Sequence, residues 1–159
     1  MGVLTRYRTT TAAGVIAVFV LVLVFGSPPY GDWARDNANG TGALDLFLSV
    51  LTWPSWDFSA DLPVRDVVAV MLRAILVVAF TALFLAALTA ARSGSALAQL
   101  FIGWAAVVFA GAAAGLVTGI IQSDTSALAV FQLISSGATY GIFAGWIVGL
   151  ATLRAPARR

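Results

Sequence analysis

Three long apolar runs constrain what this chain can fold into more than any other feature of its sequence. They cover Val67–Ala91, Ala96–Ile121 and Ala127–Leu153. A helix that rises 1.5 Å per residue needs about 20 apolar residues to cross the roughly 30 Å of hydrocarbon in a bilayer. Each run exceeds that length, so each is expected to form a transmembrane helix. A shorter run, Thr10–Phe25, qualifies as a fourth span when the threonines before it enter the headgroup region.

The composition agrees with a membrane chain. Hydrophobic residues make up 60% of the sequence and charged residues 10%, and the mean hydropathy is +0.96. Soluble domains carry about 25% charged and about 45–50% apolar residues. We therefore predict an all-α integral membrane protein, a four-helix transmembrane bundle that forms a single membrane domain. The expected spans are residues 10–27, 65–91, 96–121 and 127–153, with an outer loop at 28–64.

The charges predict the orientation of the four spans. All basic residues are Arg and all acidic residues are Asp. One side of the predicted membrane carries six Arg and no acidic residue, whereas the other carries two Arg and seven Asp. Because positive residues stay in the cytoplasm during insertion, we expect both termini to be cytoplasmic, in the cell (inner or plasma) membrane. A cleaved signal peptide is the alternative for the first run; it would leave three spans in the same orientation.

The outer loop is the only sizeable segment predicted outside the membrane. Its first part, residues 27–42, is rich in turn-forming residues. Residues 43–53 carry apolar side chains at helical spacing and are too few to span the bilayer, so we expect a short amphipathic helix at the interface or packed on the bundle. Trp53, Trp56 and Phe58 follow. Such aromatic residues form either a belt at the water–lipid boundary or a docking surface for another membrane subunit.

Glycine recurs every fourth residue in the last two predicted spans. Helices in lipid adhere through close backbone approach, which glycine permits, and this spacing places each row on one helix face. The rows either face each other and hold a helical hairpin together, or one of them faces another copy of the chain. The residues are Gly111, Gly115 and Gly119 in one row and Gly137, Gly141, Gly145 and Gly149 in the other.

Arg73 is the only charged residue inside one of the four apolar runs, about 10 Å below the outer boundary. An ionisable group at such a position is a functional hypothesis and needs a partner. One interpretation is that Arg73 reaches the outer headgroups beside a few interhelical hydrogen bonds. The other is an outward-facing polar site that binds an anionic headgroup, a lipid-linked substrate or an ion. Its other candidate residues in the outer half are Asp66, Gln122, Asp124, Gln132 and Ser136.

The residue types argue against catalysis. The chain has no His, Cys, Lys or Glu, so acid–base chemistry falls to Asp and Tyr. Metal-ligand spacing and glycine-rich phosphate loops are absent from the sequence, so we expect no enzyme, no catalytic residue, no metal site and no cofactor. Topology explains the Arg-rich ends, and no nucleic acid is expected as a partner.

The preferred function is therefore a non-catalytic accessory or scaffold subunit of a membrane complex, which interacts through its outer loop and Gly-rich helices. The expected partners are membrane lipids and other membrane subunits or the chain itself. A homo-oligomeric channel or small permease that uses the region of Arg73 is the alternative.

Overall fold

The computed structural model describes residues 2–38, 40–56, 63–90, 95–122 and 126–153. Within these ranges all regular secondary structure is helical. The six helices are α1 (Gly2–Phe25), α2 (Pro28–Asn37), α3 (Ala43–Leu51), α4 (Val64–Ala90), α5 (Ala96–Gln122) and α6 (Ala127–Leu153).

Three of these helices are long and apolar enough to cross a membrane. α4, α5 and α6 have 27 residues each, which corresponds to about 40 Å of helix. They begin and end within one residue of the expected spans at 65–91, 96–121 and 127–153. The ends of these helices were predictable because a helix that crosses a bilayer needs about 20 apolar residues, and a run of that length is visible in the sequence.

The first apolar run behaves differently. Thr10–Phe25 meets the criteria for a span only together with Pro28–Asn37, and the two parts are bent by 65° at the break between them. The described chain thus holds three candidate spans, or four if the bent pair counts as one. Gly26 lies at the bend, where a side chain would collide with the carbonyl of Pro54. Close approach of these two backbone segments therefore requires glycine.

The turn-rich prediction for residues 27–42 is wrong for its first part, because residues 28–37 form α2. Two prolines at the first helical positions preset φ, and Ser27 takes the extended N-cap conformation. Tertiary contacts then hold the helix. The ring of Tyr30 meets Phe25 edge-on at 4.9 Å, and its hydroxyl donates a hydrogen bond to the carbonyl of Leu48 in α3 (3.0 Å).

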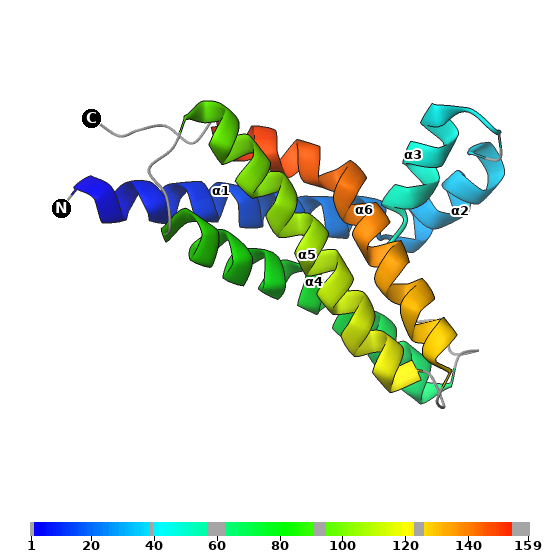
Figure 1. Ribbon diagram of the computed structural model, residues 1–159. Coiled ribbons are helices and arrows are strands. Elements are labelled where there is room, and N and C mark those ends of the chain that lie inside the picture. The colour runs from blue at the N-terminus through cyan, green and yellow to red at the C-terminus, as the bar shows by residue number, and fades with distance from the viewer. Residues whose placement is uncertain (1, 39, 57–62, 91–94, 123–125, 154–159) are drawn as a thin grey trace.

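The four long helices form a ring. α1 packs on α4 and α6, and α5 packs on the same two helices. Val18, Val77, Val107 and Val148, one from each long helix, are fully buried between them. Figure 1 shows α2 and α3 beside α6, at the end of α1 that lies away from the N-terminus. α3 contacts α6 there, for example through Phe47 and Phe143 of α6 (ring centroids 5.9 Å apart).

α5 and α6 pack through their glycine rows. A side chain on Gly111 would strike the carbonyl of Gly137, and one on Gly137 would strike the carbonyl of Gly111. The same holds along the hairpin. Added side chains would meet backbone of the facing helix at Gly115, Gly119, Gly141, Gly145 and Gly149, and also at Gly103, which the predicted rows did not include. In this geometry the rows face each other within one chain, which brings the two backbones together.

Candidate functional site

Arg73 lies inside the bundle rather than on its surface. Its side chain is only 8% exposed. Nη2 donates a hydrogen bond to Oε1 of Gln122, at the end of α5 (3.1 Å). The guanidinium carbon lies 5.5 Å from the centre of the Trp53 ring, within the range of a cation–π contact. α4, α5 and the segment after α3 thus meet at one charged group.

Trp53 connects this charge to α6. Its ring centroid is 5.4 Å from that of Tyr140, and its outer edge packs against Gly137, where any side chain on that glycine would collide with it. Tyr140 is fully buried. We call Arg73, Gln122, Trp53 and Tyr140 the Arg73 cluster.

The Arg73 cluster holds several buried donors without a hydrogen-bond partner. Within the described ranges, three buried side-chain polar atoms lack a partner, and all three belong to it: Nε of Arg73, Nε1 of Trp53 and the hydroxyl of Tyr140. Buried polar groups in folded proteins are nearly always paired, so a concentration of unpaired ones needs an explanation. Arg73 also forms no ion pair in the part of the chain that the structure describes.

The sequence-predicted polar residues divide between two places. Gln122 joins Arg73, whereas no hydrogen bond or ion pair joins Asp66 to Arg73. Gln132 and Ser136 are exposed and line a hollow between α3 and α6. Asp124 and Phe58, both predicted as site or interface residues, lie outside the described residues.

The hollow between α3 and α6 has a volume of about 740 Å³. We call it the α3–α6 groove. Its hydroxyl groups donate to their own helices: Ser136 to the carbonyl of Gln132 (2.9 Å) and Thr139 to that of Ser135 (2.8 Å). The oxygen atoms of these hydroxyl groups can still accept a hydrogen bond from a further donor. The groove is lined by Ser49, Val50, Thr52, Trp53, Phe131, Gln132, Ser135, Ser136 and Thr139.

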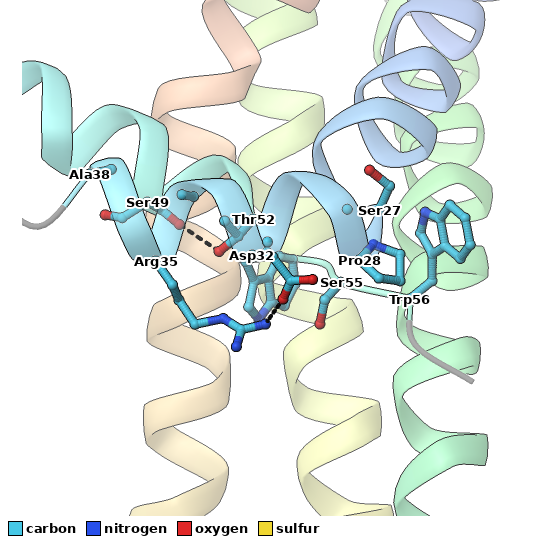
Figure 2. Close-up of a pocket in the computed structure, with 13 residues that line it drawn as sticks. Ser27, Pro28, Asp32, Arg35, Ala38, Ser49, Thr52, Ser55 and Trp56 are labelled. Carbon is cyan, nitrogen blue, oxygen red and sulfur yellow. Dashed lines mark hydrogen bonds and ion pairs between the residues drawn. The ribbon is translucent and has the colours of Figure 1, made fainter. Parts of the chain in front are cut away.

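A second hollow, of about 610 Å³, lies between α2, α3 and the segment that follows α3 (Figure 2). Its charged groups, Asp32 and Arg35, form an exposed ion pair with each other. Exposed pairs of this kind contribute little stability. Trp56, another predicted interface aromatic, lines this hollow and donates its indole hydrogen to the carbonyl of Val22 (3.1 Å). Trp56 therefore ties the segment to the end of α1.

Burial also affects the one tyrosine of α2. Burial raises the pKa of the Tyr30 phenol above its usual range, and the protonated hydroxyl donates to Leu48. This contact holds α2 on α3 and so shapes one side of the second hollow.

Sequence reasoning missed Tyr140. One signal was available: this Tyr is the fourteenth residue of a 27-residue helix, far from either end. Tyr in apolar spans usually lies at the water–lipid boundary, and a buried hydroxyl is normally paired. A mid-span Tyr is therefore a candidate site residue by itself.

The described residues contain no group of three or more His, Cys, Asp or Glu side chains that could hold a metal ion. Comparisons with protein-family models, with curated proteins and with solved structures find no match.

Proposed function

We propose that this chain is a small multi-pass membrane protein and a non-catalytic accessory or scaffold subunit that binds a partner membrane protein along the α3–α6 groove. The observation that carries the proposal is the gathering of polar side chains in this groove, on a helix that is otherwise apolar enough to span a membrane. The proposed orientation of the chain places both termini on the cytoplasmic side of the cell membrane, as the distribution of arginine in the sequence predicts.

The two exposed faces of α6 differ in chemistry. Away from α3 the exposed side chains are apolar, as at Ile142, Ile147 and Leu150. Towards α3 the polar side chains of Gln132 and Ser136 are exposed beside the apolar Phe131. Lipid tails cannot hydrogen-bond with a carboxamide, whereas Ser, Thr and Gln side chains join helices across a membrane interface. A partner helix in the groove would satisfy these groups.

The glycine rows favour the groove as the docking surface. Gly111 and Gly137 already face each other within the chain, so they have no free face to offer another copy. The glycine rows are therefore expected to act inside the subunit, and we place the partner on the α2–α3 region with the neighbouring face of α6, where polar side chains are exposed.

Photo-crosslinking in native membranes tests the proposal. A photoreactive residue at Ser136 or Ser49 should give one discrete protein adduct, whereas the same residue at Leu150 should give only lipid adducts. Gln132→Leu combined with Ser136→Leu should abolish the adduct formed from Ser49. The proposal is wrong if the groove positions react only with lipid, or if Leu150 gives the same protein adduct.

A channel or small permease built from several copies is the second candidate, and the burial of Arg73 without an ion pair in the described residues is what favours it. The purified protein in liposomes distinguishes the two. A channel conducts ions or solutes by itself and loses flux with Arg73→Gln, whereas an accessory subunit shows no flux and co-purifies with a larger protein.

A further inference from the structure

We propose that the Arg73 cluster is a binding site for a phosphate-type oxyanion, carried either by a lipid headgroup or by free phosphate. The proposal is independent of the docking role of the α3–α6 groove. It starts from the three unpartnered atoms in the cluster, which come from α4, α6 and the segment after α3.

The free groups all suit an anion. Nε of Arg73 and Nε1 of Trp53 can only donate, and the hydroxyl of Tyr140 can donate as well. The carboxamide oxygen of the cluster, Oε1 of Gln122, is already used by Arg73, which leaves the Tyr140 hydroxyl as the cluster's other side-chain acceptor. A ligand therefore has to bring acceptors.

The positive charge of Arg73 also favours an anionic ligand. A guanidinium remains protonated in proteins, and a buried cation without a counter-charge is costly. The structure pairs Arg73 with a neutral amide and an aromatic face, and with no carboxylate in the described ranges. A bound anion would supply the missing charge.

The number of donors favours an anion with several oxygens. The guanidinium carbon of Arg73 lies 5.5 Å from the centre of the Trp53 ring, and the ring centroids of Trp53 and Tyr140 lie 5.4 Å apart. The unpaired donors therefore come from three neighbouring side chains, and phosphate offers several acceptor oxygens that match the planar fork of Arg.

An apolar groove of about 530 Å³ lies between α1 and α4, the helix that carries Arg73, and offers space for an acyl chain. Its lining side chains are all apolar and include Ala74, which follows Arg73 in the sequence, and Trp56. Trp53 forms part of the wall of both polar hollows, while Arg73 lines neither, so Trp53 covers the charge. A phosphate that carries an acyl chain is therefore expected to bind more tightly than inorganic phosphate.

Ligand-dependent thermal stability of the purified full-length chain in dodecyl maltoside tests the site. The probes are dioctanoyl-phosphatidylglycerol, inorganic phosphate and, as a neutral control, dioctanoylglycerol. A ligand that binds only the folded state raises the unfolding midpoint, and the concentration dependence gives a dissociation constant. We expect the phosphatidylglycerol to raise the midpoint and the diacylglycerol to leave it unchanged. A shift with inorganic phosphate alone supports the same site with free phosphate as its ligand.

Two variants and a matched control complete the experiment. Arg73→Gln should weaken binding by roughly tenfold or more, whereas Arg65→Gln, the same charge change at an exposed position of the same helix, should not. Tyr140→Phe removes one unpaired hydroxyl. It should leave the ligand-free midpoint unchanged and weaken binding several-fold, a combination that a merely structural role would not give. If Arg73→Gln does not fold, Arg73→Lys, which keeps the charge but loses the fork, should weaken binding instead.

The proposal is overturned if neither phosphate probe stabilises the wild-type chain, or if dioctanoylglycerol stabilises it as much as the phosphatidylglycerol. It is also overturned if the Arg73 and Tyr140 variants bind as tightly as Arg65→Gln.

Discussion

At the scale of single residues, Arg73 is the side chain whose burial is expected to cost the fold free energy. Its guanidinium is enclosed, donates to Gln122 and lies against Trp53. Desolvation of such a charge costs free energy that one neutral acceptor and one ring recover only in part. Without a bound anion, the cluster is therefore expected to weaken the fold rather than to stabilise it.

This leads to a prediction with opposite outcomes for two contacting residues. In detergent free of lipid and phosphate, Arg73→Met should leave the free energy of unfolding unchanged or raise it by up to about 2 kcal/mol. Gln122→Met, which removes the acceptor and leaves the cation, should lower it by about 1–3 kcal/mol. Unfolding followed by circular dichroism checks both. Greater destabilisation by Arg73→Met than by Gln122→Met would contradict the assignment.

Residue types in the sequence single out Arg73 and Gln122, and the structure places them in contact. Their remaining neighbours depend on how each helix is rotated about its axis, and one sequence with apolar residues on all sides of its helices carries little record of that rotation. This is why Gln132 and Ser136, expected near Arg73, line the α3–α6 groove instead, and why Trp53, expected at an interface, lies against Arg73.

At the scale of elements, the α5–α6 hairpin depends on glycine at defined positions. Gly111→Leu should lower the free energy of unfolding by about 3 kcal/mol, because the new side chain meets the carbonyl of Gly137 and the two helices have to separate. Ala87→Leu, at an exposed position of α4, is the matched control and should be neutral. Equal midpoints for both variants in detergent would show that the rows do not hold the hairpin.

α2 and α3 depend on each other in a similar way. Tyr30→Phe removes the hydrogen bond to Leu48 and should cost about 1 kcal/mol of local stability. Amide hydrogen exchange should then become faster in α3 and stay unchanged in α5, since α3, unlike α5, loses a contact. Unchanged protection in α3 would contradict the dependence of α3 on this hydrogen bond.

The presence of α3 was predictable from its apolar spacing, whereas that of α2 was not. The residues of α2 favour turns locally, and the helix is held by contacts of Tyr30 with Phe25 and Leu48, which come from other elements. Propensity is a weak guide wherever tertiary contacts of this kind decide the conformation.

At the scale of the whole molecule, α4, α5 and α6 are predictable from hydropathy alone, because each is an apolar run long enough to cross a bilayer. The first span is less well defined, because the chain bends by 65° after Phe25 and continues as α2. A sequence pattern records how apolar a segment is, but not the packing of Gly26 against Pro54 that accompanies the bend.

We propose that these helices form a bundle that crosses the membrane, with both ends of the chain on the cytoplasmic side and α2 and α3 on the other, as the distribution of arginine predicts. The natural chain has no cysteine, so single cysteines give labelling without background. They are introduced at Val3, Gly40, Gly94, Thr125 and Ala157 in intact cells, with a membrane-impermeant thiol reagent added outside. The account predicts labelling at Gly40 and Thr125 alone; loss of the N-terminal segment with that pattern would indicate a cleaved first span, and labelling at Gly94 or Ala157 from outside would contradict the topology.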